Sequence, residues 1–158
     1  MALSKLNHLY MAVVADHSKH PHHYGQLEGV EAVQLNNPTC GDVISLTVTF
    51  NDDKIENIAF AGNGCTISTA SSSMMTDAVI GKSKSEALAL ADIFSEMVQG
   101  KEDPSQKELG EAALLAGVAK FPQRIKCSTL AWNALKEAIQ RSDVEKISDK
   151  NIKEEKDV

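Results

Sequence analysis

The sequence predicts an α+β fold in which a small three-stranded antiparallel sheet is covered by about five helices. Residues 43–50 alternate apolar and polar side chains, which is typical of a strand with one buried face. Residues 55–61 follow after a short turn as another strand, so the two segments should form an antiparallel hairpin. Apolar residues in most of the remaining chain recur at intervals of three and four, which indicates helices. Strands that precede a run of helices favour an α+β architecture.

The first elements are an amphipathic helix and the three strands. Apolar or amphipathic residues from Leu6 to His17 recur with helical spacing, so this opening helix should pack on the rest of the domain. Pro21 and Gly25 end the helical pattern. The strands are then expected at residues 30–35, 43–50 and 55–61.

The next two helices are recognised by their ends. Small residues at positions 66–80 predict a helix that Gly81 closes. Ser83 and Glu86 form a capping box ahead of a second helix, and Gly100 ends it.

Two further helices complete the predicted fold. Asp103 followed by Pro104 is typical of a helix start, and this helix should continue to about Val118. The last helix is expected to begin around Cys127 or Ser128.

The composition suits a single domain. The chain has 158 residues, of which 42% are apolar, so it can build one core. We expect this domain at residues 1–141, followed by a charged, disordered tail at residues 142–158.

A net charge of −6 with two arginines argues against nucleic-acid binding. The sequence has no apolar run of about 18 to 20 residues and no signal-peptide pattern, so we expect a cytoplasmic protein without a membrane partner.

Three cysteines and one aspartate form a candidate metal site. Cys40 lies in Pro-Thr-Cys-Gly-Asp, Cys65 in Gly-Asn-Gly-Cys and Cys127 in Arg-Ile-Lys-Cys-Ser. Asp42 would complete four ligands for a tetrahedral ion. An odd number of widely separated cysteines does not resemble a disulfide framework. Zinc is the expected ion, but an iron–sulfur cluster uses the same types of ligand and the spacing does not decide between them.

The predicted elements give these thiols reactive positions. Cys65 and Cys127 are expected at helix N-termini, where unpaired N–H groups favour a thiolate. Arg124, three residues before Cys127, could stabilise a thiolate or a persulfide by its charge, and the alternative is an ordinary surface arginine. The histidines of the first connection show no ligand periodicity, so we expect them to be exposed rather than metal-bound; they are His17, His20, His22 and His23.

Together the three cysteine motifs resemble those of the IscU/NifU N-terminal family of iron–sulfur cluster assembly proteins, and more narrowly the SufU type. The second and third motifs extend to Gly-Asn-Gly-Cys-Thr-Ile-Ser and Arg-Ile-Lys-Cys-Ser-Thr-Leu-Ala-Trp. The resemblance covers the chain from the opening helix to about Gln140 and implies a SufE/NifU-IscU-like fold.

Two departures from the IscU type favour SufU. The IscU type has a histidine before the third cysteine, whereas this chain has Lys126, which is normally protonated and a poor ligand. The SufU resemblance implies Asp42 as the fourth ligand instead. The segment Lys101–Gly117 also resembles the insertion that separates SufU from IscU.

The resemblance implies a sulfur relay rather than a stand-alone small-molecule enzyme. SufU-like proteins are zinc-dependent sulfurtransferases that accept persulfide sulfur from a SufS-type cysteine desulfurase and pass it to the SufBCD scaffold. In this chain Cys40 would be the acceptor, with Asp42, Cys65 and Cys127 as the remaining metal ligands and Cys127 as the alternative acceptor. Two other functions remain open: an IscU-like scaffold for assembling and transferring an iron–sulfur cluster, and a structural zinc-binding module.

Overall fold

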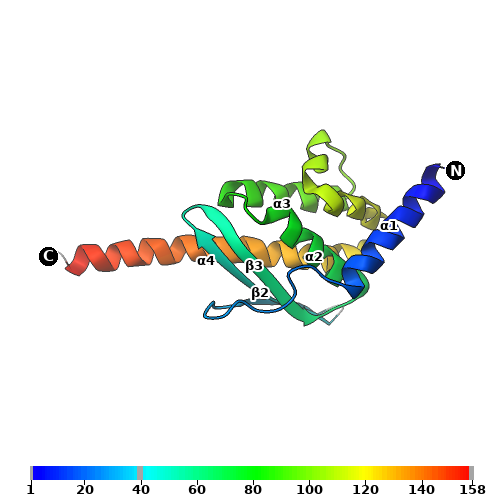
Figure 1. Ribbon diagram of the computed structural model, residues 1–158. Coiled ribbons are helices and arrows are strands. Elements are labelled where there is room, and N and C mark those ends of the chain that lie inside the picture. The colour runs from blue at the N-terminus through cyan, green and yellow to red at the C-terminus, as the bar shows by residue number, and fades with distance from the viewer. Residues whose placement is uncertain (1, 39–40, 157–158) are drawn as a thin grey trace.

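The computed structural model describes residues 2–38 and 41–156, and their side chains from residue 11 to residue 143. Figure 1 shows the resulting arrangement of one sheet and several helices. In chain order the elements are α1 (Ala2–Lys19), β1 (Val33–Asn37), β2 (Asp42–Asn51), β3 (Lys54–Asn63), α2 (Thr66–Val79), α3 (Lys84–Val98), the 3₁₀ helix η1 (Pro104–Lys120) and α4 (Pro122–Lys156).

The three strands form one antiparallel sheet in the order β1-β2-β3, which confirms the predicted sheet. Leu46 in the central strand is paired with Val33 on one side and Phe60 on the other. Directly paired residues point to the same face of a sheet, and all three of these side chains are buried. Helix α4 contacts β1 and β2, and α2 contacts β3, so helices cover this apolar face.

The second face of the sheet is also covered at its centre, whereas the sequence predicted one buried face. The connection between α1 and β1 crosses it, and the Leu27 N–H donates a hydrogen bond of 3.0 Å to Thr47 Oγ1. Gln26 Nε2 donates to Ser45 Oγ at 3.3 Å. Thr47 and Ser45 are therefore buried, and their polar groups bond to this connection instead of to water.

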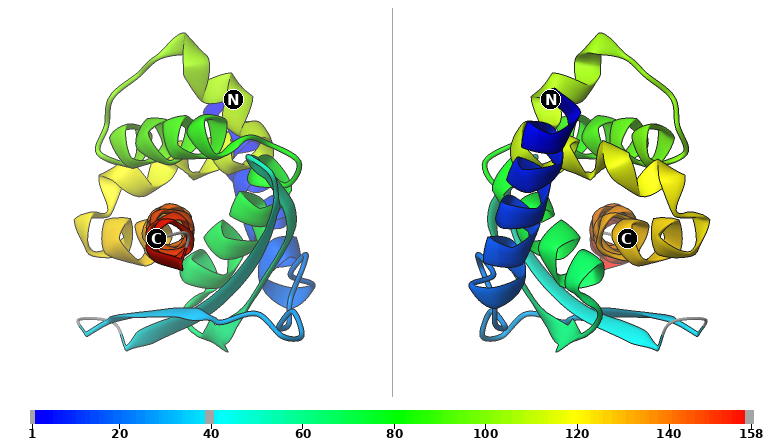
Figure 2. Two further views of the ribbon diagram at one scale, coloured as in Figure 1. Left: turned by 90° about the vertical axis from the view of Figure 1, so that its left-hand side faces the viewer. Right: turned by 90° about the vertical axis from the view of Figure 1, so that its right-hand side faces the viewer.

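Helix α4 is the centre of the helical layer. It contacts α2, α3 and η1 as well as the sheet, and the views along its axis in Figure 2 show it enclosed by them. Trp132 stacks on Phe94 with ring centroids 4.6 Å apart. The indole Nε1 donates to Ser71 Oγ at 3.1 Å, and this hydroxyl donates to the Ser128 carbonyl at 2.5 Å. These contacts join α2, α3 and α4 in one core.

The predicted start signals of α3 and η1 are confirmed, but η1 is not an α-helix. Ser83 Oγ accepts a hydrogen bond from the Glu86 N–H at 3.1 Å. Asp103 Oδ1 accepts one from the Ser105 N–H at 2.8 Å. The 3₁₀ helix is interrupted at Gly110, whose φ of 62° lies in the left-handed region that glycine adopts readily.

Helix α4 differs from the prediction at both ends. It begins at Pro122, a proline at the first helical position, rather than at Cys127 or Ser128. Its backbone stays helical to Lys156, where the sequence predicted a disordered tail, and this end projects beyond the body of the domain in Figure 1. Residues 142–156 lack proline and glycine and contain many lysines and glutamates, which helices accommodate well. No helix in the described part of the chain is long and apolar enough to cross a membrane.

Candidate metal centre

Asp42 supplies a buried carboxylate at the first residue of β2. Its side chain is only 2% exposed. The Cys65 N–H donates to Oδ1 at 2.9 Å, and Oδ2 lies 3.9 Å from Cys65 Sγ. Strand pairing of β2 with β3 causes this approach, because Val43 pairs with Asn63 and thereby places Asp42 beside the turn that leads to Cys65.

Cys65 is the N-cap residue of α2, as the sequence predicts. Its backbone is extended, with φ of −71° and ψ of 171°, and its Sγ accepts a hydrogen bond from the Ser68 N–H at 3.4 Å. The sulfur therefore faces the free N–H groups and the positive end of the helix dipole, which favour a thiolate. The side chain is partly exposed and forms no disulfide.

Cys127 is not at a helix start, which corrects the prediction. Because α4 begins at Pro122, Cys127 lies in its second turn and is fully buried. The effect of the helix dipole falls off within the first turn. The predicted stabilisation of a Cys127 thiolate by the helix N-terminus therefore does not apply. Burial against the rest of the domain, rather than the helix end, positions this sulfur.

Three of the four predicted ligands lie together. One ligand atom each from Asp42, Cys65 and Cys127 lies within 4.8 Å of the other two. A tetrahedral zinc site, with Zn–S of about 2.3 Å and Zn–O of about 2.0 Å, separates its ligand atoms by about 3.5 to 3.8 Å. The group therefore fits zinc after shifts of a few tenths of an ångström to about one ångström. Cys40, the fourth predicted ligand and the predicted sulfur acceptor, lies outside the described residues.

Arg124 and Lys126 differ in their relation to this centre. Both are exposed. The thiolate of Cys65 and then that of Cys127 raise the pKa of the Arg124 guanidinium above its ordinary value, through charge attraction and hydrogen bonding. Arg124 is thus both a surface residue and a neighbour of the sulfurs. Lys126 points to solvent, beside the buried Cys127.

Exposed apolar side chains flank the centre, and the sequence analysis did not single them out. Val43 is 45% exposed and follows Asp42 directly. Phe121 is 60% exposed, and its carbonyl accepts a hydrogen bond from the Arg124 N–H. Tyr24 is 55% exposed, and its hydroxyl donates to the Gly62 carbonyl at 3.3 Å. Val43 directly follows Asp42 and Phe121 lies three residues before Arg124, which was the signal available in the sequence; Tyr24 comes near the centre only through the fold.

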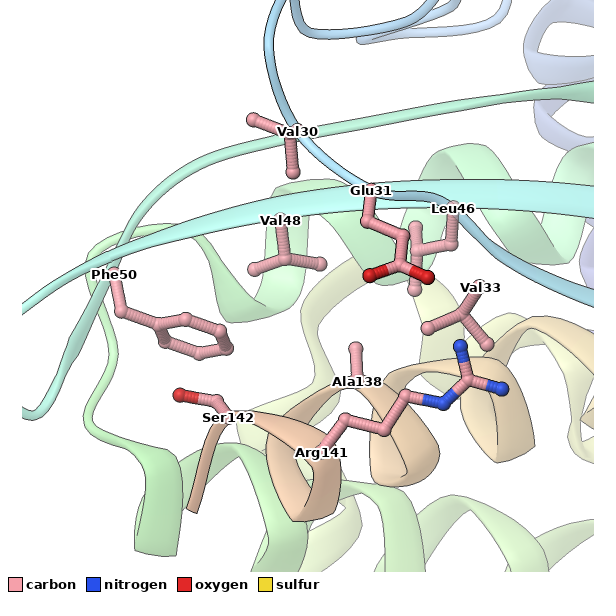
Figure 3. A pocket seen from close by; sticks show the side chains of 9 residues that line it. All are labelled: Val30, Glu31, Val33, Leu46, Val48, Phe50, Ala138, Arg141 and Ser142. Carbon is pink, nitrogen blue, oxygen red and sulfur yellow. The ribbon is translucent and has the colours of Figure 1, made fainter. Parts of the chain in front are cut away.

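The described residues beside the centre form a small hollow. The hollow beside it, lined partly by Gly62, Gly64 and Ser68, has a volume of about 10 Å³, too small for a substrate. A larger cavity of about 130 Å³ lies at the other end of β2, next to Phe50 and Ser142, as Figure 3 shows. The described lining of that cavity contains none of the predicted site residues.

The prediction of exposed histidines is wrong for His17. This side chain is 1% exposed. Its Nδ1 lies 2.7 Å from Ser73 Oγ and its Nε2 lies 2.6 Å from Glu111 Oε2. Its partners are 56 and 94 residues away in the chain, so no local spacing could have indicated them. His20, His22 and His23 are exposed or partly exposed, as expected.

Comparison with known proteins shows the family of this chain. The NifU-like N-terminal domain matches residues 9–128. The chain is 85% identical over 159 residues to the iron–sulfur cluster assembly scaffold protein IscU of Streptococcus pyogenes serotype M1, covering 100% of both chains. It is 46% identical over 140 residues to the zinc-dependent sulfurtransferase SufU of Bacillus subtilis, covering 89% of this chain and 95% of that relative.

A solved structure supports the same assignment. A protein of Fervidobacterium islandicum AW-1, assigned as an iron–sulfur cluster assembly scaffold for the SUF system, matches with a TM-score of 0.76 at 35% identity, over 80% of this chain and 93% of that one. The segment that the NifU-like N-terminal domain matches, residues 9–128, includes the cysteines of all three motifs. The protein therefore belongs to the family of the NifU-like N-terminal domain, the IscU- and SufU-type proteins of iron–sulfur cluster assembly.

Proposed function

We propose that the protein is a zinc-dependent sulfurtransferase of iron–sulfur cluster assembly. In this proposal it accepts persulfide sulfur from a SufS-type cysteine desulfurase and passes it to the SufBCD scaffold. The main support for this proposal is the buried carboxylate of Asp42. One of its oxygens and the sulfurs of Cys65 and Cys127 all lie within 4.8 Å of one another. A charged carboxylate is normally buried only when it is paired or coordinates a metal. The SufU name of the 46% identical relative supports the same reading.

The proposed zinc ligands are Asp42, Cys65, Cys127 and Cys40, which precedes Asp42 by two residues. Zinc bound there would keep the cysteines as thiolates at neutral pH. The Cys65 N–H holds one oxygen of Asp42, so the other oxygen stays directed toward the sulfurs. This arrangement fixes three ligands within the fold, and Cys40 would be the fourth.

Cys40 is the proposed sulfur acceptor. Its thiolate attacks the outer sulfur of the desulfurase persulfide, a new S–S bond forms on Cys40, and the desulfurase cysteine leaves as a thiolate with the electron pair of the broken S–S bond. The transfer requires no external oxidant or reductant. For this attack Cys40 has to leave the ligand set, by exchange with a group from the partner. Arg124, already beside Cys65 and Cys127, would stabilise the negative charge that passes between the two proteins.

The shape of the surface supports a protein as the sulfur donor. A hollow of about 10 Å³ cannot enclose a small thiol substrate, whereas Val43, Phe121 and Tyr24 provide exposed apolar area around the centre. Apolar and aromatic side chains of this kind are enriched at protein interfaces. We therefore propose that the desulfurase docks on the exposed apolar surface formed by Val43, Phe121 and Tyr24.

One observation favours a second candidate function. The relative that is 85% identical carries the name of an iron–sulfur cluster assembly scaffold, and a cluster uses cysteine ligands like those present here. A third possibility, a zinc ion that only holds loops together, has less support, since such sites usually contain a close pair of cysteines in sequence.

Metal analysis separates these functions. The protein purified without reconstitution should be colourless and hold about one zinc per chain. Asp42→Asn keeps the side-chain shape but removes the charge, and should weaken zinc retention against a chelator about tenfold or more. Asp53→Asn, the same change at an exposed turn residue, is the control. A brown protein with iron and sulfide in stoichiometric amounts would support the scaffold, and unchanged zinc retention in Asp42→Asn would remove Asp42 from the site.

A desulfurase assay tests the sulfur transfer. Adding the protein to its cysteine desulfurase should raise the turnover of cysteine to alanine, and Cys40→Ser should abolish this stimulation. Mass spectrometry of the protein after the reaction, without reductant, should locate the added sulfur on Cys40. Finding it on Cys127 instead would contradict the acceptor assignment, and finding it on no cysteine would contradict the relay.

A further inference from the structure

A second group of metal-ligating side chains lies away from the cysteine centre. His17 near the end of α1, His22 in the following connection and Asp77 in α2 each place one ligand atom within 4.8 Å of the other two. Asp77 is twelve residues beyond Cys65 along α2, which corresponds to about 18 Å of helix. The two groups are therefore separate sites, one near each end of α2.

His17 is the fixed member of this group. It is 1% exposed, and its two ring nitrogens contact Ser73 Oγ at 2.7 Å and Glu111 Oε2 at 2.6 Å. Ser73 Oγ also accepts a hydrogen bond of 2.7 Å from the His22 N–H, so its own hydrogen can be donated to His17 Nδ1. The ring proton of His17 then lies on Nε2, where Glu111 Oε2 accepts it. Nδ1 can therefore exchange the Ser73 hydroxyl for an ion while Glu111 holds the ring. Metal-ligating histidines characteristically have such a second contact.

His22 and Asp77 form the accessible side of the group. His22 Nδ1 lies 2.5 Å from Asp77 Oδ2, with side chains 45% and 41% exposed. The rings of His17 and His22 have centroids 4.6 Å apart. An ion can thus reach the group from solvent and take the place of the proton shared by His22 and Asp77. Glu111, 62% exposed at the side chain, contacts His17 Nε2 at 2.6 Å and adds negative charge there.

We propose that His17, His22 and Asp77 bind a divalent first-row transition-metal ion, independently of the cysteine centre and of the sulfur-transfer function. Two imidazoles and one carboxylate suit ions such as Zn²⁺, Fe²⁺ and Co²⁺. Mg²⁺ and Ca²⁺ prefer oxygen ligands only. The remaining coordination positions are taken by water. Binding ties the connection after α1 to α2 through an ion in place of a shared proton.

Cobalt titration of the full-length, untagged protein with zinc already in its cysteine centre tests this proposal. Co²⁺ bound by nitrogen and oxygen shows weak ligand-field bands, whereas Co²⁺ that displaces zinc at the cysteines shows intense thiolate charge-transfer bands, so the spectrum identifies the site. We expect one Co²⁺ per chain to bind with ligand-field bands alone. Its binding should also raise the thermal unfolding temperature.

Variants of exposed residues assign the ligands without disturbing the core. His22→Ala and the nearly isosteric Asp77→Asn should weaken Co²⁺ binding about tenfold or more and remove the rise in unfolding temperature. His20→Ala changes an exposed histidine outside the group and should leave both unchanged. The proposal is overturned if the wild-type protein binds no Co²⁺ beyond the cysteine centre, or if the His22 and Asp77 variants bind it as tightly as His20→Ala.

Discussion

At Gly64 the backbone passes so close to the metal centre that the absence of a side chain shapes the site. A Cβ atom built there would lie 2.9 Å from Ser68 Oγ and 3.2 Å from Asp42 Oδ1. Ser68 would have to move for a side chain at position 64 to fit, and Asp42 is a proposed zinc ligand. Glycine in this turn therefore allows Asp42 and the start of α2 to approach each other.

Gly64→Ala should consequently weaken the metal centre more than the fold. The added methyl group would push against Asp42, so we expect zinc retention against a chelator to fall about tenfold, as for loss of a group that supports a ligand. Gly117→Ala is the matched control, because a Cβ there meets nothing within 4 Å. Equal zinc retention in the two variants would show that the turn can relax without moving Asp42.

The elements that the sequence predicted best are those with a local pattern. The alternation in residues 43–50 follows from the pleat of a strand, so it located β2 and its apolar face. The start of α4 was missed because Gln123, Arg124 and Lys126 are all exposed and give its first turns no apolar stripe. Spacings of three residues occur in both α and 3₁₀ helices, so the sequence predicted a helix here without distinguishing the two types.

The candidate site divides in the same way. The three sequence motifs identified Asp42, Cys65 and Cys127, and the fold brings these three together, although Cys127 lies in the second turn of α4 and not at the predicted helix start. The burial of His17 was not predictable, because it depends on Ser73 and Glu111 in distant elements. Contacts between elements, unlike the elements themselves, leave no periodic trace in the chain.

The contact between α2 and α4 behind the cysteines gives a test at this scale. Ser71→Ala removes the acceptor of the buried Trp132 indole and the donor to the Ser128 carbonyl. Leaving buried polar groups unpaired costs about 1 to 3 kcal/mol, so the free energy of unfolding in urea should fall by that amount. Ser72→Ala on the same helix is the control: its buried hydroxyl bonds only to the Ser68 carbonyl one turn back, and its loss should change stability by less than about 0.5 kcal/mol. Similar values for both variants would contradict a special role of Ser71.

At the scale of the whole molecule, α4 connects the metal centre to the opposite end of the domain. Cys127 lies near its start, and Lys84 of α3 is tied to it beyond the middle, where Nζ donates to Ser142 Oγ and Asp143 Oδ1 at 3.0 Å each. The Lys84 ammonium also lies 4.8 Å from the centre of the Phe50 ring. The C-terminal end of α4 projects beyond the body of the domain, as Figure 1 shows.

The folded domain should therefore end within α4, close to the boundary at residue 141 that we proposed from the sequence. A chain that stops at Ile147 keeps one helical turn after Asp143, so its thermal unfolding temperature and zinc content should equal those of the full chain.

Asp143→Ala in the full chain should instead lower the free energy of unfolding by about 1 kcal/mol, because it removes a partner of the buried Lys84, although the 58% exposure of Asp143 weakens the effect. Asp149→Ala, six residues further along α4, is the control and should change nothing. A clear loss of stability in the shortened chain would mean that residues 148–158 belong to the folded domain, contrary to the predicted boundary.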